Sequence, residues 1–555
     1  MPEYLSPGVY VEEVDRGPKP IEGVGTAMAA FVGFTEKAEY AREVDNELVV
    51  EDLLNRPQLV TNWTQFVERF GSFVPGVNLP QSVYGYFTNG GSRCYVVSVR
   101  TFPRAEGVLM NAQGKPALTV RARQAGVDGM KLRVRVGNLA LPAPAASGKK
   151  GAAAAAAADG EAAPEAPASD SSGDRGFTLY VEKEAAAGGW KPVETVADVR
   201  LQTAVIQGTK QVVLAYKNNK LPKFIELIVM EAAALDKAMP REQEQPLSID
   251  KKLLETPVAS DFRGDVSERK GVEGLEVLDD VTMLVVPDLM TTMPGEKLDL
   301  DMVKAVQSMM IAHCERMGDR VAILDTPPDL TPQEAKRWRM DIAGFDSSYA
   351  AMYYPWIKVM DAATDTVIKM PASGHVAGLW ARSDNTRGVH KAPANEVLLG
   401  AIGLAYQITK GEQDTLNPIG VNCVRTFPGR GIRVWGARTL SSDPAWRYIN
   451  VRRLFNFVEK SIENGTQWVV FEPNDRKLWA RVNRDVSSFL RIVWRDGALF
   501  GSSPAEAFYV KVDDELNPSE SRDLGRLIIE IGMAPVKPAE FVIFRISQWA
   551  GPGAE

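Results

Sequence analysis

The sequence has very few cysteines and histidines, and this limits the chemistry that it can support. Among its 555 residues there are three of each. The cysteines, Cys94, Cys314 and Cys423, are odd in number and far apart, so they form neither a disulfide framework nor a CxxC metal pair. We expect them to be small buried core residues. Three histidines are too few for a multi-histidine metal site, so we expect no metal.

Long apolar runs are also missing. No uninterrupted stretch approaches the roughly 20 apolar residues that a membrane-spanning helix needs. The opening "MPEYLSPGVYVEEV" has no basic region followed by an apolar one, so it is not a secretion signal. We therefore expect no membrane insertion, and synthesis and assembly in the cytoplasm. The net charge of −7 disfavours nucleic acid as a partner, because an acidic protein repels phosphates unless a basic patch is concentrated locally.

Motifs for cofactors and catalysis are absent. The glycine-rich stretches at 23–28 and 429–434 both lack the third glycine of a dinucleotide-binding fingerprint, and "SGKKG" lacks the spacing of a phosphate-binding loop. Neither a GxSxG nor an HExxH sequence occurs. The sequence therefore predicts no cofactor.

The stretch 370–396 is the one that most resembles an active site. Ser373, His375 and Asp384 form a possible triad, but nothing in the sequence fixes their geometry and no oxyanion motif accompanies them. The interpretation that we favour is structural: the segment is a long loop pinned by charge-assisted hydrogen bonds, with neutral, hydrogen-bonded histidines at 375 and 390. The loop-pinning residues in this interpretation are His375, Arg382, Asp384, Arg387 and Glu396.

The order of expected elements predicts a multidomain protein of mixed α/β and α+β class. Strands and helices alternate over 21–103 and again over 266–416, which indicates one α/β core domain that is interrupted. Asp288 and Asp325 end two of its strands, where α/β enzymes place functional groups, but we interpret both as caps of turns or of the helices that follow. The interruption, 104–265, alternates like strands and is a variable β-rich insertion. Its Ala-, Pro- and Gly-rich loop 139–176 is expected to be disordered and dispensable.

The last part, 417–555, is expected to be a separate α+β unit. Helices are predicted at 447–464 and 475–494, the second with an apolar stripe running from Trp479 to Val493. Four strands are expected in "QWVVF", "EAFYVKV", "RLIIEIGM" and "EFVIFRIS". The cations on the polar faces of the two helices are candidates for contact with a partner protein: Arg452, Arg453, Lys460, Arg481, Arg484 and Arg491.

Both ends of the chain are expected to be extended arms. In the N-terminal arm, 1–20, Val9 and Val11 alternate with Tyr10 and Glu12 after a Pro-Gly breaker, and no partner strand lies nearby. Such a strand suits β-augmentation, in which it completes the sheet of another copy through main-chain hydrogen bonds. The strands expected to accept it, or to be donated in turn, contain Phe508, Val510, Val542, Phe544 and Ile546.

Three long strings carry a resemblance to a known family. They are "PASGHVAGLWARSDNTRGVHKAPANE", "LNPIGVNCVRTFPGRGIRVWGARTLSSDPAWRYINVRRLFNFVEKSIENGTQWVVFEPND" and "GMAPVKPAEFVIFRISQ". They resemble the tail sheath proteins of contractile phages and of phage-tail-like contractile injection systems. The "YLSPGVYVEEV" and "GLEVLDDVTMLVVPDL" stretches resemble the same family, so the likeness covers about 1–100 and 265–555.

The resemblance implies a structural protein without a catalytic site. Its copies would stack as hexameric rings, or as an equivalent six-start helix, around an inner tube, and contraction would drive the tube through a target envelope. The implied partners are further copies of the chain, the inner tube protein, and baseplate and tail terminator or cap proteins. The cations named above would face the tube.

Two other classes of function remain as alternatives. One is a cytosolic α/β enzyme with a β-rich regulatory insertion, which predicts a discrete ligand and a monomer or closed oligomer. The other is a nucleic-acid-binding protein that uses the arginine-rich C-terminal unit, but the acids among these arginines favour a solvated or protein-facing surface.

Overall fold

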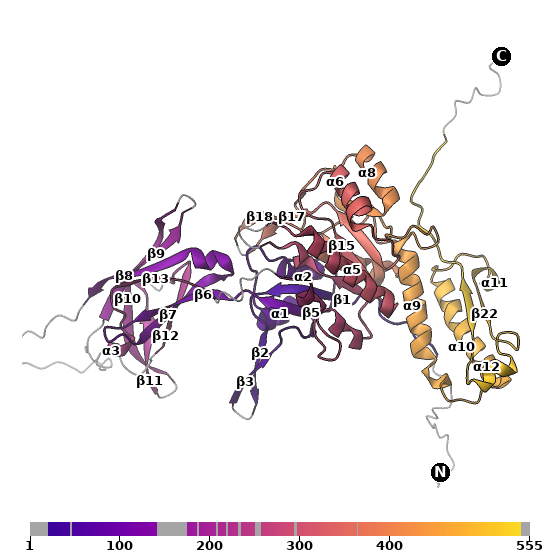
Figure 1. Cartoon of the computed structure of the whole chain (residues 1–555), viewed down its shortest axis with the longest axis horizontal. Coiled ribbons are helices and arrows are strands. Elements are labelled where there is room, and N and C mark those ends of the chain that lie inside the picture. Colours follow the sequence, from indigo (N-terminus) through magenta and orange to yellow (C-terminus); the bar gives the residue numbers. More distant parts are fainter. Residues whose placement is uncertain are drawn as a thin grey trace, which may run out of the picture.

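The computed structural model shows three parts in a row, with the β-rich insertion at one end, an α/β domain in the middle and the C-terminal unit at the other end (Figure 1). It describes residues 20–44, 47–140, 175–185, 188–206, 209–217, 220–230, 235–249, 257–292, 297–362 and 364–545. The predicted strand at Val9–Glu12, most of the loop 139–176 and Ile546 lie outside these residues.

The central domain is built on an eight-stranded sheet with the strand order β21-β20-β16-β15-β14-β1-β5-β4. All neighbouring strands are parallel except the edge strands β4 and β21. The bounds are β1 Ala29–Thr35, β4 Gln58–Val60, β5 Cys94–Thr101, β14 Met283–Val285, β15 Val321–Asp325, β16 Ala350–Tyr354, β20 Val421–Phe427 and β21 Gly431–Val434.

The strand order confirms that one α/β domain is interrupted. β1 lies between β5, which precedes the insertion, and β14, which follows it. One boundary differs from the prediction: β20 and β21 extend the central sheet, although residues from 417 onward were assigned to the C-terminal unit. Sequence pattern alone missed this, because β20 pairs with β16, which is far back in the chain.

Helices cover both faces of the central sheet and enclose two cores. The first core lies under α1 (Trp63–Phe70), α2 (Leu79–Thr88) and α7 (Ser373–Arg387), and the second under α5 (Leu300–Met317), α6 (Pro332–Arg337) and α8 (Lys410–Leu416). The ends of several helices carry the expected capping residues, such as Asn62 before α1 and Asp299 before α5. All three cysteines are buried in these cores, as predicted.

Smaller elements complete the domain. A hairpin of β2 (Glu39–Val44) and β3 (Glu47–Asp52) projects from it (Figure 1). A three-stranded sheet is formed by β17 (Ile357–Asp361), β18 (Thr366–Met370) and β19 (Gly403–Leu404), and a short helix, α4, covers Ala259–Arg263.

The insertion is β-rich, as predicted, and it has a core of its own. Its five-stranded sheet has the order β11-β10-β9-β8-β13, and its three-stranded sheet has the order β12-β7-β6. The bounds are β6 Arg104–Met110, β7 Pro116–Ala125, β8 Leu132–Ala140, β9 Arg175–Glu184, β10 Trp190–Ile206, β11 Thr209–Ala215, β12 Ile225–Val229, α3 Leu235–Ala238 and β13 Gln243–Pro246. Ala140 pairs with Gly176, so the two ends of the loop are neighbours that a short turn could join.

The C-terminal unit packs two long helices and a two-stranded sheet around a fourth core. Its elements are α9 (Ile449–Gly465), α10 (Arg476–Arg495), α11 (Pro504–Ala507), β22 (Phe508–Lys511), α12 (Ser519–Asp523) and β23 (Glu530–Met533). The apolar stripe of α10 is buried as predicted, and Asp475 caps the helix by accepting a hydrogen bond from the backbone N–H of Leu478.

Two predicted strands of this unit are not formed. Residues 467–469 form a 3-10 turn, and the exposed Val470 and Phe471 follow it. Phe471 has a positive φ of 69°, which no regular strand adopts. Residues 541–545 have no pairing partner among the described residues of the chain, so this apolar run stays unpaired.

Candidate functional site

The contact between the central domain and the C-terminal unit contains several buried charged side chains. It is formed by α9, by α7 and by residues 20–28, which run between them into β1. Arg452 and Arg453 on α9 are only 5% and 4% exposed. Both were predicted to lie on a solvent-facing side of this helix. The contacts that each residue makes show why that prediction is wrong.

Arg453 is held by a two-pronged ion pair with Asp384 of α7. Its Nη1 and Nη2 donate to the two carboxylate oxygens at 2.9 and 2.5 Å. Nη2 also donates to the carbonyl oxygen of Thr26 at 2.9 Å, and the guanidinium lies 4.7 Å from the ring centroid of Trp380. One side chain therefore joins three segments that are far apart in the sequence.

The other two α9 cations also face inward. Arg452 donates to Asn456 at 2.7 Å, and its guanidinium lies 4.3 Å from the ring centroid of Trp446. Lys460 forms ion pairs with Asp279 and Asp319 at 3.4 and 3.6 Å. These pairs attach α9 to the central domain. Within the subunit, Arg452 and Arg453 are thus buried in internal contacts, and Lys460 is half-buried in ion pairs.

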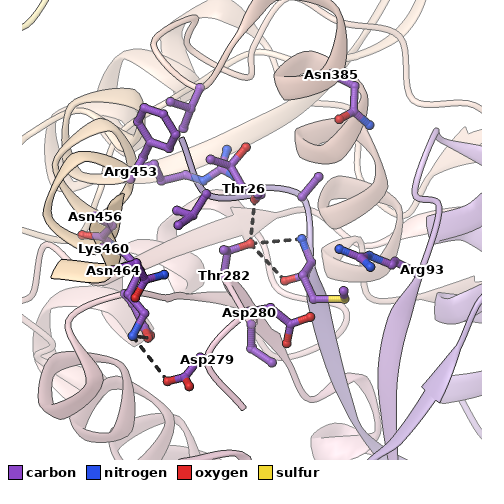
Figure 2. Close-up of a pocket in the computed structure, with 18 of the residues that line it drawn as sticks. Thr26, Arg93, Asp279, Asp280, Thr282, Asn385, Arg453, Asn456, Lys460 and Asn464 are labelled. Carbon is purple, nitrogen blue, oxygen red and sulfur yellow. Dashed lines mark hydrogen bonds and ion pairs between the residues drawn. The ribbon is translucent and has the colours of Figure 1, made fainter. Parts of the chain in front are cut away.

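A cavity of about 440 Å³ lies along this contact (Figure 2). Thr26 and Thr282 sit in its middle, with Arg453, Asn456 and Lys460 on the α9 side (Figure 2). The hydroxyl of Thr282 donates to the carbonyl oxygens of Thr26 and Met28. On the α9 side, the backbone N–H of Val24 donates to Ser461 at 3.1 Å. The chain that leads toward the N-terminal arm is therefore fixed against α9 before it leaves the domain.

The segment predicted to be a pinned loop is a helix instead. Of the five loop-pinning residues, His375, Arg382, Asp384 and Arg387 lie on α7 and Glu396 lies beyond it. Glycine, serine and asparagine made the segment read as a loop. The glycines among them allow α7 to pack closely against α2. A Cβ atom added at Gly374 would lie 2.5 Å from Ser82, and one added at Gly378 would clash with Tyr86.

The five loop-pinning residues do not form ion pairs with one another within the described part of the chain. Arg382 donates to the carbonyl oxygens of Asn89 and Val397 at 3.0 and 2.6 Å. Glu396 forms an ion pair with Lys391 at 3.5 Å. No ion pair of Arg387 occurs within the described part of the chain.

No catalytic triad is formed by Ser373, His375 and Asp384. Both oxygens of Asp384 are occupied by Arg453. His375 is packed against Gly85 of α2, and burial lowers its pKa to about 4. Its Nδ1 has no hydrogen-bond partner among the described residues, which contradicts the prediction of a hydrogen-bonded ring. Burial also lowers the pKa of His390.

Two buried carboxylates at the ends of parallel strands act as caps, as the sequence indicated. Asp288 accepts hydrogen bonds from the backbone N–H groups of Asn78 and Leu79, at the start of α2, and from that of Phe34 on β1. Asp325 accepts from those of Ala372 and Ser373, at the start of α7. The capped helices are remote in sequence rather than the next ones along the chain. Burial raises the pKa of Asp288 to about 6 and that of Asp325 to about 7.

The C-terminal segment is anchored and then left exposed. Glu540 forms an ion pair with Arg438 at 2.6 Å and accepts hydrogen bonds from Asn417 and Tyr448. The next four residues, Phe541, Val542, Ile543 and Phe544, are 69–83% exposed. We call residues 541–544 the apolar tail. Val470 and Phe471, the other exposed apolar pair of the unit, were missed because they read as a strand interior.

The described ranges contain neither a metal-binding cluster nor a membrane-spanning helix. No group of three His, Cys, Asp or Glu residues there could hold a metal ion. Nor is any of the helices described long and apolar enough to cross a membrane.

Comparisons with known proteins agree on one family. Residues 271–440 match the family model described as "Phage tail sheath protein central domain", and residues 441–548 match "Phage tail sheath C-terminal domain". A prophage major tail sheath protein of Pseudomonas aeruginosa (strain UCBPP-PA14) is 30% identical over 323 residues, which are 56% of this chain and 79% of that protein. The tail sheath protein of Burkholderia phage BcepMu is 29% identical over 40% of this chain and 48% of its own.

Solved structures show the same fold over nearly the whole chain. The sheath of an extracellular contractile injection system (PVC) in its contracted state aligns with a TM-score of 0.54 and 22% identity, over 99% of both chains. The contracted helical sheath of the anti-feeding prophage aligns with a TM-score of 0.54 and 23% identity, over 98% of this chain and 99% of that one.

Removing one partner of the buried ion pair should destabilise the protein strongly. In Asp384→Ala the charge of Arg453 stays buried without its partner, which typically costs about 3–5 kcal/mol. We expect a clearly lower midpoint in thermal unfolding followed by circular dichroism. Asp514→Ala is the matched control, because Asp514 pairs with Arg476 on the surface and both side chains are more than half exposed. Equal effects of the two substitutions would contradict the structural role of the buried pair.

Asp325 should make stability depend on pH near neutrality. Its pKa is raised to about 7 in the folded chain from an ordinary value near 3.8, so the folded state binds this proton more tightly than the unfolded one. The stabilising contribution is therefore complete at low pH and is lost as the pH rises through about 7. Asp325→Asn removes this titration and keeps an acceptor for the two N–H groups.

Relative to the variant, the natural chain should lose on the order of 1 kcal/mol of unfolding free energy between about pH 6 and pH 8. Unfolding of both proteins in urea at several pH values measures this difference. Asp288 is present in both chains, so its titration cancels. A difference that stays constant with pH would show that Asp325 does not titrate in this range.

Proposed function

We propose that this chain, which belongs to the phage tail sheath family, polymerises as stacked hexameric rings or an equivalent six-start helix around an inner tube. Contraction of this sheath would drive the tube through a target envelope. Its partners would be further copies of the chain, the inner tube protein, and baseplate and cap proteins. The chain would act as a structural subunit within a phage tail or tail-like particle, rather than as an enzyme.

The observation that carries the proposal is the incomplete sheet of the C-terminal unit. β22 and β23 pair only with each other among the described strands, so each has one edge without a strand partner there. A sheet edge without a strand partner is a template for pairing with a strand of another chain. The apolar tail, which contains Val542 and Phe544, lies exposed on the same chain. Exposed apolar runs of this kind mark interaction sites.

Strands donated by other copies would complete this sheet. The N-terminal arm, with Val9, Tyr10, Val11 and Glu12 at its centre, would supply one, and the C-terminal segment with Val542, Phe544 and Ile546 another. Phe508 and Val510 lie on β22, at the edge to be extended. Such donation joins different surfaces of the two copies, so it does not close a dimer and generates a helical polymer.

Contraction would then be a repacking of subunits that stay joined through the donated arms. Each backbone hydrogen bond contributes about 0.5–1.5 kcal/mol, which is small singly but large when repeated along a polymer. The free energy for movement would come from the difference between two packings of the subunits, so no nucleotide is required.

The surface that meets the tube would lie on α10 rather than α9. Arg452 and Arg453 on α9 are buried and Lys460 is half-buried, whereas Arg484 and Arg491 on α10 are exposed. Arg481 is half-buried, with its guanidinium 3.8 Å from the ring centroid of Trp468. Surface pairs between these cations and acids of a tube would be weak and reversible, as a contact that must release during contraction requires.

Removal of the arm should leave a folded chain that cannot polymerise. We expect the chain without residues 1–14, and the variant Val9→Pro/Val11→Pro, to keep a native circular dichroism spectrum but to form no rods in negative-stain microscopy, because proline removes backbone donors. Val9→Ile/Val11→Ile, which keeps both donors and strand propensity, should assemble normally. Full-length sheaths from the truncated chain would refute strand donation, and unfolding would show that the arm pairs within its own subunit.

Charge reversal on α10 should weaken assembly on the tube. We expect Arg484→Glu/Arg491→Glu to reduce co-sedimentation of sheath with purified tubes by severalfold at low salt, with a smaller difference at high salt because salt screens exposed charges. Lys115→Glu/Lys191→Glu, in the insertion, changes as many exposed charges far from α10. If the α10 and insertion variants assemble equally well, the tube contact lies elsewhere.

A further inference from the structure

A groove with a volume of about 850 Å³ lies beside the anchored C-terminal segment. Its walls come from the end of α7 and the turn after it, from α8, from β20 and from the residues that follow β21. Residues 536–542, which include the start of the apolar tail, complete them. We call it the tail groove. Its occupant can be inferred from its chemistry and from the part of the chain that begins beside it.

The groove combines aromatic rings with positive charge. The rings of Phe427 and Trp435 lie 4.5 Å apart between their centroids, and the guanidinium of Arg425 is 5.3 Å from that of Phe427. The Nε of Arg425 is buried and has no hydrogen-bond partner among the described residues. This donor needs an acceptor, because an unpaired buried donor is costly.

The rim of the groove adds further cations. Arg387, Lys391 and Lys410 line it, and the acids among the lining residues are Asp414 and Glu540. Glu540 is already bound by Arg438. The groove therefore favours an acidic segment that also carries apolar or aromatic side chains.

A segment with this composition begins next to the groove. Pro20, the first residue described, lines a neighbouring cavity of about 720 Å³, and Arg387 and His390 line both hollows. The preceding residues 9–15, "VYVEEVD", contain three acids, no base, one tyrosine and three valines. At roughly 3.5 Å per extended residue, residues 9–19 span up to about 38 Å, which is ample for a groove that shares wall residues with the cavity at Pro20.

We propose that the tail groove binds residues 9–15 of its own chain while the subunit is free, next to the apolar tail. The acids pair with the rim cations and with Arg425, and Tyr10 packs against the aromatic rings. A short tether gives an effective concentration on the order of millimolar, so weak contacts suffice. The inference rests on the proposed function of the arm as a donated strand, since the groove holds the arm back until a neighbouring sheet competes for it.

The full-length chain can test where the arm lies. Tyr10 is replaced by the photo-crosslinking residue p-benzoylphenylalanine, and dilute free subunits are irradiated and analysed by peptide mass spectrometry. We expect crosslinks within one chain to groove peptides at 387–395, 410–414 and 425–437. Crosslinks of Tyr10 within the free subunit to other regions, or none at all, would overturn the proposal and leave strand donation between copies untouched.

A charge swap separates specific pairing from misfolding. Glu12→Lys/Glu13→Lys should lower the crosslink yield at least about fivefold, as should Arg425→Glu/Lys410→Glu. Combining the two pairs of substitutions should restore the yield, which a folding defect would not allow. The matched control is Lys336→Glu/Arg337→Glu, which reverses two exposed cations on α6 outside the groove and should have no effect. No recovery in the combined variant would also refute the pairing.

Assembly kinetics distinguish this inference from the proposed function. Release of the arm predicts that Arg425→Glu/Lys410→Glu forms rods several times faster than the natural chain, by light scattering and negative-stain microscopy. Loss of rods in this variant would show that the groove is a contact between copies and overturn the proposal. Rods from the chain without residues 1–14 would instead refute strand donation by the arm, which is the part of the proposed function on which this inference rests.

Discussion

The pairing of Arg453 with Asp384 is the interaction on which the arrangement of the parts depends. An arginine can be buried only if its charge and its donors are satisfied, and here one carboxylate, one carbonyl oxygen and one aromatic ring do this together. The carboxylate and the aromatic ring belong to α7, and the carbonyl oxygen belongs to the segment before β1. Arg453 therefore helps to fix the C-terminal unit against the central domain. It also fixes the segment that leads to the N-terminal arm. The C-terminal sheet and the start of the N-terminal arm, which we propose take part in strand donation, thus have fixed positions on the subunit.

The carboxyl edge of the central sheet shows how side chains placed like the catalytic groups of α/β enzymes can serve helix packing. Asp288 and Asp325 sit where catalytic groups of α/β enzymes are found, but their oxygens accept the N–H groups that begin α2 and α7. The carboxylates are thus used to hold two helices that pack against each other. His375 lies on α7 against Gly85 of α2, and burial there lowers its pKa to about 4, so the ring is neutral at pH 7. The polar residues that suggested an active site support the packing of the domain.

Sequence patterns predicted those parts whose chemistry is local. The stripe of α10, the buried strands of the central sheet and the β-rich insertion all follow from short-range periodicity. The errors arose where a remote partner changes the meaning of a residue. Arg453 has the spacing of a solvated face, and only Asp384, 69 residues earlier, makes it a core residue. Likewise α7 has the composition of a loop, and its glycines are explained only by α2. Residues 541–545 are strand-like, but a strand needs a neighbour, and no described segment of the chain provides one.

The way in which the insertion joins the central domain has an evolutionary consequence. The chain leaves the domain after β5 and returns at α4, and Arg100 and Asp261 form an ion pair at 3.5 Å across these two crossings. The backbone N–H of Phe102 bonds to Thr35 at the same place. The insertion has its own core, and the central domain holds both segments that connect to it. The insertion is therefore an independent structural module. Recombination or gradual change can replace it with another module of any topology, provided that its ends lie close together, while the central sheet stays unchanged.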